Sequence, residues 1–300
     1  MKYTVVVTTF NSSLTVANAI NSILRLSPEP EEIIIIDDAS KDNTVEKIRD
    51  LTLGFRNFRM IINSQNKGQS YSRNLGVKEA KTENVIVMDD DDYSLSNRAK
   101  IHLDALANGA DISYISSVKV YPNKYRVEVC NSNLTSSPLM TSKLIKHMVT
   151  GTPLANSLRV FSPSCALAFK KSSFLRINGF DENLKRLEDI DFACRALRQD
   201  LILNWSSEIA LERYHSLGND KSAKANFDGE MSVLKSVRDI LGTKEYFVAR
   251  QMALFRYGYL EKDFVSLLKK SHLLPVIILI APSKVIAVLK RLKHDFAQRV

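Results

Sequence analysis

The segment NVIVMDDDD (residues 84–92) joins an uninterrupted apolar run to four consecutive aspartates. IIIIDD (residues 33–38) has the same pattern, a short apolar run that stops at acidic residues. Runs of this length suit strands that are buried on both faces, as in a parallel sheet. Because parallel strands end at one edge of the sheet, we expect both acidic groups to lie at the edge where α/β proteins bind ligands.

The segments around these two runs alternate between strand and helix signals. Tyr3–Phe10 is predicted to be a strand, and a helix is indicated after it by apolar residues at helical spacing: Val16, Ile20, Ile23 and Leu24. A second unit has a predicted strand over 58–62 and a predicted helix over 71–80, before the strand at 84–88. This alternation predicts an α/β fold with a Rossmann-like, mostly parallel sheet flanked by helices.

The second half of the chain has different signals. A strand is predicted over 111–120 and a short helix over 141–149, whereas 121–138 and 151–163 are rich in Asn, Ser, Pro and Gly and are predicted to be loops. From Glu230 onward, helical periodicity replaces strand signals. We therefore predict one α/β domain over 1–225 and a helical C-terminal region over 226–300.

The composition is that of an ordinary globular protein. The chain has 300 residues, of which 45% are hydrophobic and 25% are charged, so a sizeable core is expected and disorder is excluded. The chain has three cysteines, Cys130, Cys165 and Cys194, an odd number without the spacing of metal ligands. A disulfide framework is therefore not expected, and a reducing compartment is favoured. The N-terminus lacks the features of a signal peptide, so a cytoplasmic location is expected.

The net charge of +9 is concentrated near the C-terminus. Residues 266–300 contain seven Lys/Arg and one acidic residue, Asp295. The remainder is nearly balanced and has no basic groove with interleaved aromatic residues, so nucleic acid is not an expected partner.

The two acidic groups together place six carboxylates at one predicted rim: Asp37, Asp38, Asp89, Asp90, Asp91 and Asp92. These carboxylates repel one another unless a cation or hydrogen-bond donors gather there. Mg²⁺ and Mn²⁺ take oxygen ligands, often one or two carboxylates together with substrate phosphates. The pattern predicts a Mn²⁺ or Mg²⁺ site, and the alternative is that the aspartates are solvated turn residues.

Five ordered motifs give the chain a specific resemblance. They are VVVTTFN (5–11), IIIIDDASKDNT (33–44), NKGQSYSRNLG (66–76), MDDDD (88–92) and GFDENLKRLEDIDFACRAL (179–197). In this order and spacing they are similar to the motifs of family 2 glycosyltransferases, which have the GT-A fold. The resemblance covers about the first 215 residues and implies a nucleotide-sugar-binding catalytic domain with a helical C-terminal extension.

The resemblance assigns residues to the donor side of the site. Phe10 takes the place of an aromatic residue that packs on the nucleotide base, and Asp38 that of a carboxylate that accepts a hydrogen bond from the base. Other donor contacts are implied at Thr9, Asn11, Asn66, Gly68, Arg73, Asp89 and Asp90. The alternative for Arg73 is a structural ion pair with an acid near the core edge.

A metal ion and a general base are also implied. Asp91 would hold the metal, with Asp92 as the alternative ligand, and His215 matches a position that is sometimes a metal ligand or phosphate contact. Asp189 would deprotonate the acceptor hydroxyl in an in-line, inverting displacement, and Glu188 would orient the acceptor or the base. The alternatives are a surface histidine and acids that stabilise the dipole of a helix.

The resulting hypothesis is a metal-dependent inverting hexosyl- or N-acetylhexosaminyltransferase. It would move a sugar from a nucleotide donor, a UDP-sugar, to a glycan or lipid-linked glycan in bacterial surface polysaccharide or lipopolysaccharide synthesis. A sugar nucleotidyltransferase and a dehydrogenase both require a glycine-rich phosphate loop after the first strand, and TTFNSSL (residues 8–14) has no glycine. A noncatalytic binding or scaffold protein that keeps the fold is the alternative from another class.

The basic tail carries a separate hypothesis. The apolar stretch Leu273–Ala281 is shorter than a membrane-spanning helix requires. Beyond it, apolar residues fall on one helical face with cations elsewhere: Val285, Val288, Leu289, Leu292 and Phe296. This pattern over 273–299 predicts an interfacial helix on an anionic membrane, at the inner face of the plasma membrane. The alternative is an amphipathic helix docked on the catalytic core.

Overall fold

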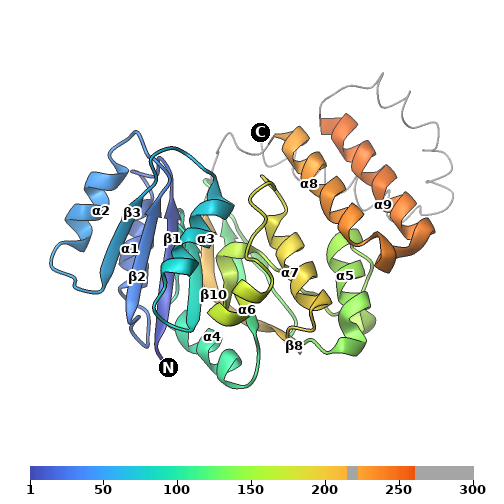
Figure 1. The fold of residues 1–300 in the computed structure, drawn as a ribbon, viewed down its shortest axis with the longest axis horizontal. Helices are drawn as coiled ribbons and strands as arrows, with labels where there is room; N and C mark the ends of the chain where they lie inside the picture. The colour runs from blue at the N-terminus through green and yellow to red at the C-terminus, as the bar shows by residue number, and fades with distance from the viewer. Residues whose placement is uncertain (215–221, 261–300) are drawn as a thin grey trace. The chain divides into compact units, whose positions relative to one another are not determined.

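The computed structural model describes residues 1–214 and 222–260 (Figure 1). The chain divides into two compact units, Met1–Gly218 and Asn219–Val300. The first unit contains strands β1 to β10 and helices α1 to α7, and the second contains α8 and α9. The described parts confirm the predicted architecture, a mixed α/β fold with a central sheet flanked by helices and a helical C-terminal part.

Ten strands form one sheet, whose main path runs in the order β3-β2-β1-β4-β9-β6-β10-β5, with β7 on β6 and β8 on β10. The strands are β1 (Tyr3–Thr9), β2 (Glu32–Asp37), β3 (Phe58–Ile62), β4 (Asn84–Asp89), β5 (Asp92–Ser94), β6 (Ile112–Val120), β7 (Arg126–Val129), β8 (Leu134–Thr135), β9 (Leu167–Lys170) and β10 (Leu203–Tyr214). The helices are α1 (Val16–Ile23), α2 (Thr44–Thr52), α3 (Gln69–Glu79), α4 (Arg98–Ala107), α5 (Thr141–Thr150), α6 (Lys171–Arg176), α7 (Glu188–Arg198), α8 (Ala223–Ser236) and α9 (Arg238–Leu260).

The first four strands of the chain are parallel, as predicted, and alternate residues face opposite layers. Val5 and Val7 belong to a core that also contains residues of α1, α2 and α4. Val6 faces the other layer, where Gly76 of α3 approaches so closely that an added Cβ would lie 2.4 Å from the Val6 Cγ1. Strands covered on both faces explain why the sequence shows continuous apolar runs there.

The second half of the sheet is mixed rather than purely parallel. β9 pairs antiparallel with β4 and β6, and the long β10 pairs parallel with β6 and antiparallel with β5. The β10–β6 register is irregular between Trp205 and Leu211. An aromatic cluster joins β9, α6, the 179–182 turn and α7, and its members are Phe169, Phe174, Phe180 and Phe192.

Some boundaries differ from the sequence prediction. The segment predicted as a loop over 121–138 contains β7 and β8, short strands that depend on pairing with β6 and β10 rather than on apolar runs of their own. The predicted domain boundary near residue 225 falls inside α8, which begins after Ser222, whose hydroxyl accepts a hydrogen bond from the Ala225 N–H at 3.1 Å. Residue periodicity locates helices better than it locates their ends.

Within the second unit, α8 and α9 pack on each other. The rings of Phe227 and Tyr257 stack with centroids 4.8 Å apart, and Glu230 forms an ion pair with Arg256. Among the helices within 1–214 and 222–260, none has both the length and the hydropathy of a membrane span. The predicted interfacial segment 273–299 lies outside the described residues.

Candidate active site

The carboxyl ends of β1, β2 and β4 meet at one edge of the sheet. Thr9 pairs with Asp37 of β2, and Thr8 pairs with Asp89 of β4. The two acidic groups of the sequence therefore lie on neighbouring sides of β1, as predicted. Since such an edge is the usual ligand-binding edge of an α/β sheet, the site is built outward from these three strand ends.

The turn after β1 is shaped by polar side chains from two other loops. Asn11 has a left-handed backbone (φ +52°), its N–H donates to the Ser40 Oγ at 2.8 Å, and its Oδ1 accepts the Lys41 N–H at 2.8 Å. Asp90 accepts hydrogen bonds from the Phe10 N–H at 3.1 Å and from the Ser12 hydroxyl. The Phe10 ring is left 44% exposed at the edge, while Thr9 is buried.

Asp38 organises the loop before α3. Its carboxylate accepts hydrogen bonds from Asn63 Nδ2 at 2.7 Å, the Lys67 N–H at 2.9 Å and the Gly68 N–H at 2.8 Å. Gly68, with a φ of +90°, directly precedes α3, and Asn66 is exposed two residues before it. In the structure, Asp38 thus fixes the backbone of the loop that carries two other predicted donor contacts.

Arg73 connects the aspartate turn after β4 to the start of α7. Its side chain is 1% exposed, and its two terminal nitrogens donate to the Asp89 Oδ1 at 2.7 Å and the Glu188 Oε1 at 3.1 Å. The guanidinium therefore has the structural ion-pairing role that was the sequence-based alternative. It holds together residues that are far apart in the sequence.

Asn74, the next residue, fixes the turn before α7. Its Nδ2 donates to the Phe180 carbonyl at 2.9 Å and the Glu182 Oε1 at 2.8 Å, and its Oδ1 accepts the Phe180 N–H at 2.9 Å. Gly179 adopts φ +63°, and a Cβ there would lie 2.6 Å from the Asn74 Oδ1 and 2.7 Å from the Phe174 ring. The glycine is therefore required both by its backbone and by its neighbours.

Helix α7 begins with the predicted acidic pair. Leu187 precedes it in a left-handed conformation (φ +64°), and the Asp189 Oδ1 accepts the N–H of Ile190 at 2.8 Å. Burial, followed by the nearby charge of Glu188, raises the pKa of Asp189 to about 7. A carboxyl group with this pKa can accept a proton near neutral pH, as a general base must.

The turn between β4 and β5 gathers the remaining acids. Ligand atoms of Asp89, Asp92 and Cys165 lie within 4.8 Å of one another. Burial and then the charges of Asp89 and Asp91 raise the pKa of Asp92 well above its ordinary value. Burial also raises the pKa of the Cys165 thiol, so its neutral form is favoured. The donor set for a hard cation is therefore the carboxylate pair Asp89 and Asp92, which fits Mg²⁺ or Mn²⁺.

The structure thus brings together most of the predicted residues. Sequence analysis gave Asp91 as the metal ligand and Asp92 as the alternative. In the structure, it is Asp92 that lies beside Asp89, and Asp91 is in the turn between β4 and β5. Asp90 is directed to the turn after β1 by its hydrogen bonds. His215 lies outside the described residues.

Two residues of this edge were missed by the sequence analysis. Arg213 on β10 pairs in register with Asp92, and its charge acts on Asp92, Asp89 and Asp189. Cys165 contributes its thiol next to Asp92. Neither belongs to a motif. Arg213 reaches the site through a strand pairing that the sequence does not indicate, and Cys165 lies in the short turn of 3-10 helix directly before β9.

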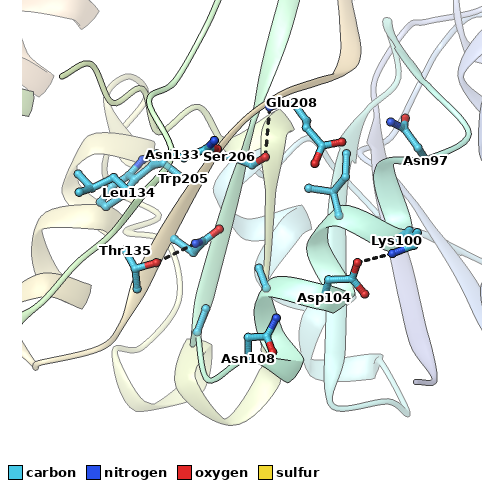
Figure 2. Close-up of a pocket in the computed structure, with 14 residues that line it drawn as sticks. Asn97, Lys100, Asp104, Asn108, Asn133, Leu134, Thr135, Trp205, Ser206 and Glu208 are labelled. Carbon is cyan, nitrogen blue, oxygen red and sulfur yellow. Dashed lines mark hydrogen bonds and ion pairs between the residues drawn. The ribbon is translucent and has the colours of Figure 1, made fainter. Parts of the chain in front are cut away.

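A second hollow lies elsewhere on the first unit, between α4, β8 and β10 (Figure 2). Its volume is about 660 Å³, and its polar lining includes Asn97, Asn108, Asn133 and Glu208, with Lys100 paired to Asp104 at 2.5 Å. None of its lining residues is a predicted site residue. Trp205 lies beneath it with a fully buried side chain, so its ring offers no exposed face.

An acidic turn, a carboxyl group of raised pKa and a buried arginine between them lie together at the ligand-binding edge of a parallel sheet, which makes this edge a candidate enzyme active site. The comparison with known families identifies the class of protein. The model of glycosyl transferase family 2 matches residues 4–174, more than half of the chain, and the chain belongs to this family.

Curated relatives are distant. The chain is 26% identical over 197 residues to an uncharacterised glycosyltransferase of Haemophilus influenzae, covering 65% of this chain and 62% of the relative. It is 22% identical over 170 residues to an Escherichia coli UDP-Gal:α-D-GlcNAc-diphosphoundecaprenol β-1,3-galactosyltransferase, covering 57% and 58%. It is 24% identical over 239 residues to the O-antigen chain rhamnosyltransferase RfbN of Salmonella typhimurium, covering 76% and 71%. The chain spans less than two thirds of the length of the first two relatives.

Solved structures agree with the fold. A crystal structure of Staphylococcus aureus TarS in complex with UDP superposes with a TM-score of 0.63 at 19% identity, covering 86% of this chain and 72% of that one. A TarS structure with UDP-GlcNAc gives the same TM-score at 18% identity. At this level of identity, the likeness establishes the GT-A fold of the chain.

Proposed function

We propose that the protein is a metal-dependent inverting glycosyltransferase that moves a sugar from a UDP-sugar to a hydroxyl of a glycan or lipid-linked glycan in bacterial surface polysaccharide synthesis. The observation that carries the proposal is the Arg73 bridge, which joins Asp89 of the acidic turn to Glu188 beside the candidate base. The names of the relatives support the setting, since they include a UDP-galactose-dependent enzyme and an O-antigen enzyme. The UDP and UDP-GlcNAc bound by TarS support a UDP donor.

On the donor side, we propose that the uracil ring of the donor packs on the exposed ring of Phe10. Asn11 and Asp38 fix the neighbouring loops by hydrogen bonds. The proposal also assigns donor contacts to Thr9, which is buried at the end of β1, and to Asn66 and Gly68 in the loop before α3. Asp90 acts through its hydrogen bonds to the turn after β1, which keep Phe10 in place. A preformed turn lowers the entropic cost of binding the nucleotide.

The carboxylates of Asp89 and Asp92 would hold a Mn²⁺ or Mg²⁺ ion, and Asp91 and His215 remain proposed contributors. Asp92 is nearly buried, at 4% exposure, next to two other acids, an arrangement that a divalent cation would stabilise. When bound, the ion supplies positive charge that stabilises the leaving diphosphate.

On the acceptor side, Asp189 removes the proton of the acceptor hydroxyl. The acceptor oxygen forms a bond to the anomeric carbon, the bond from that carbon to the diphosphate oxygen breaks, and its electron pair leaves on the diphosphate. The pKa of about 7 leaves much of the Asp189 population ionised at neutral pH, and the neighbouring Glu188 is held in place by Arg73.

We also propose that residues 273–299 attach the protein peripherally to an anionic membrane. Only the sequence supports this proposal. Replacing Lys290 and Arg291 by Glu in the full chain is expected to weaken sedimentation with vesicles that contain phosphatidylglycerol, and unchanged sedimentation would contradict it.

The test of the proposed function is nucleotide release from UDP-, GDP-, dTDP- and CMP-sugars by the full-length protein, with Mn²⁺ and with EDTA. Turnover of the UDP-sugars that requires Mn²⁺ is expected. If no nucleotide-sugar is bound or hydrolysed under any condition, the proposed function is wrong.

A further inference from the structure

Arg98, the first residue of α4, is a buried charge that the proposed mechanism does not use. It is 0% exposed, and its guanidinium donates hydrogen bonds to three uncharged oxygens: the Ser94 Oγ at 2.9 Å and the carbonyls of Val87 and Cys165, both at 2.7 Å. Burial lowers the pKa of Arg98 to about 10, so the group is still a cation at neutral pH. A cation in the interior loses its hydration, and bonds to neutral acceptors replace only part of it, so this position calls for a role beyond packing.

Two of these acceptors stand at the two ends of the acidic turn. Val87 lies in β4, two residues before Asp89, and Ser94 ends β5, two residues after Asp92. In the sheet, β9, β6 and β10 stand between β4 and β5, so the two strands that flank the turn are not hydrogen-bonded neighbours. The guanidinium of Arg98 therefore supplies a direct connection between the two ends of the turn.

The third acceptor belongs to a segment beside the turn. Cys165 lies in the short turn of 3-10 helix before β9, and its thiol is within 4.8 Å of ligand atoms of Asp89 and Asp92. One terminal nitrogen of Arg98 donates to the carbonyls of both Cys165 and Val87. The guanidinium thus fixes three segments, β4, β5 and the 3-10 turn, around the place where the two carboxylates converge.

The charge and the hydrogen bonds of Arg98 have opposite effects on a divalent cation. The charge interacts favourably with those of Asp92 and Asp89, but it repels a cation that binds between them. The hydrogen bonds hold the two ligands in place before the cation arrives. Removing an outer partner of metal ligands typically weakens metal binding by about tenfold to a hundredfold. The sign of the change in metal affinity therefore separates the two effects.

We propose that Arg98 is a positioning residue that holds the ends of the acidic turn so that Asp89 and Asp92 converge on the divalent cation, a role that rests on the proposed function. Because its side chain is buried, Arg98 acts through the segments that carry the ligands and not by contact with the donor. Its planar fork suits this role, since it directs several N–H donors to separate acceptors at fixed angles. The carboxylates are then arranged for the cation before the nucleotide binds.

The test measures the affinity of the full-length protein for Mn²⁺ by calorimetry, without nucleotide and with UDP, in the wild type, Arg98→Met, Arg98→Lys and His102→Leu. Methionine removes both the charge and the donors, whereas lysine keeps the charge but not the fork. His102→Leu is the matched control, because His102 is also fully buried on α4, one turn further on, and its Nδ1 lies 3.0 Å from the Ser113 Oγ of β6. Urea unfolding and UDP affinity in EDTA are measured in parallel.

We expect Arg98→Met to weaken Mn²⁺ binding by about tenfold to a hundredfold, because the two ligands are no longer held in place. Arg98→Lys should also weaken it, since a single ammonium cannot reproduce the fork. His102→Leu should lose stability and keep its Mn²⁺ affinity within about twofold, because its contact lies away from the turn. UDP affinity in EDTA should stay within about twofold in all variants, since other hydrogen bonds fix the donor loops.

The contrary results differ in what they overturn. Tighter Mn²⁺ binding in Arg98→Met would mean that Arg98 acts only as a nearby positive charge, and an unchanged affinity would mean that it only supports the core. If Arg98→Met does not fold, a wild-type Mn²⁺ affinity in Arg98→Lys would contradict the role of the fork. An equal loss in His102→Leu would mean that any destabilisation of α4 disturbs the turn. Failure of the wild type to bind Mn²⁺, with or without UDP, would instead overturn the metal dependence of the proposed function.

Discussion

The donor side and the acceptor side of the site are held in place by different kinds of contact. On the donor side, the loops after β1, β2 and β3 are tied to one another, through pairs such as Asn11 with Ser40 and Asp38 with Gly68. On the acceptor side, the 179–189 segment is tied to α3, through Arg73 and Asn74. The donor side is thus a set of loops on one continuous parallel sheet, and the acceptor side depends on two residues of one helix.

This difference teaches where substitutions should be most damaging. A change in one donor loop leaves the other hydrogen bonds of that loop in place. In the described part of the chain, a change at Arg73 or Asn74 removes one of two such connections between α3 and the 179–189 segment. The predictions below are ordered from the largest expected effect to the smallest.

Arg73→Gln is expected to have the largest effect on stability. It leaves Asp89 and Glu188 without their shared cation, and breaking a buried ion pair from one side costs about 3 to 5 kcal/mol. Urea unfolding measures the change in the free energy of unfolding. Lys2→Gln is the control, since its pair with Glu31 is exposed on both sides and should contribute less than about 1 kcal/mol. Equal losses in the two variants would show that Arg73 does not bridge the two sides.

Asp92→Asn is expected to weaken Mn²⁺ binding by about a hundredfold, because it removes one of the two convergent carboxylates. Calorimetry with Mn²⁺ measures this affinity in the presence of UDP. Asp91→Asn is the comparison variant and should lose less. A larger loss in Asp91→Asn would assign the metal to the residue that the sequence resemblance favoured.

Gly179→Ala is expected to destabilise the acceptor side by about 2 to 3 kcal/mol, because a residue with a Cβ is strained in the left-handed backbone of this position and the new Cβ meets Asn74 and Phe174. Gly54→Ala provides the control, since Gly54 also has a positive φ (+89°) but nothing lies within 4 Å of its added Cβ. Thermal unfolding should show a smaller loss in Gly54→Ala. If the losses are alike, the contacts of Gly179 do not matter beyond its backbone.

The smallest predicted effect is a pH dependence of stability. The pKa of Asp189 is about 7 in the folded protein and about 4 in an unfolded chain, so the folded state binds more protons between these values. Stability contributed by this group is therefore lost as pH rises through this range. Asparagine does not titrate, so this pH-dependent loss is absent from Asp189→Asn. We expect the free energy of unfolding of the variant, relative to that of the wild type, to rise by about 1 to 2 kcal/mol from pH 5 to pH 8. A difference that is independent of pH would mean that the pKa is not raised.

The sequence predicted the donor side better than the acceptor side, for a physical reason. The runs that end at Asp37 and Asp89 belong to parallel strands whose ends meet on either side of Thr8 and Thr9, so their meeting could be inferred from local patterns. The placement of Arg213 could not, because it depends on the irregular register of β10 and on its pairing with β5.

Motifs also indicated which residues gather at the site but not what each one contacts. Asp38 and Asp90 were expected to face the nucleotide, and in the structure their carboxylates accept hydrogen bonds from neighbouring loops. Three of these donors are backbone N–H groups, those of Phe10, Lys67 and Gly68, and since every sequence offers such groups, residue identity gives no signal for them.

The measurement that tests the central claim most directly is the comparison of donor binding and donor turnover in Asp189→Asn. UDP-sugar affinity with Mn²⁺ should stay within about twofold of the wild type, because the donor side does not depend on this residue. Sugar transfer should fall by about a hundredfold to ten-thousandfold, as expected when a general base is removed. Turnover that is retained in Asp189→Asn, or donor binding that is lost with it, would contradict the assignment of base and donor site to two sides joined by Arg73.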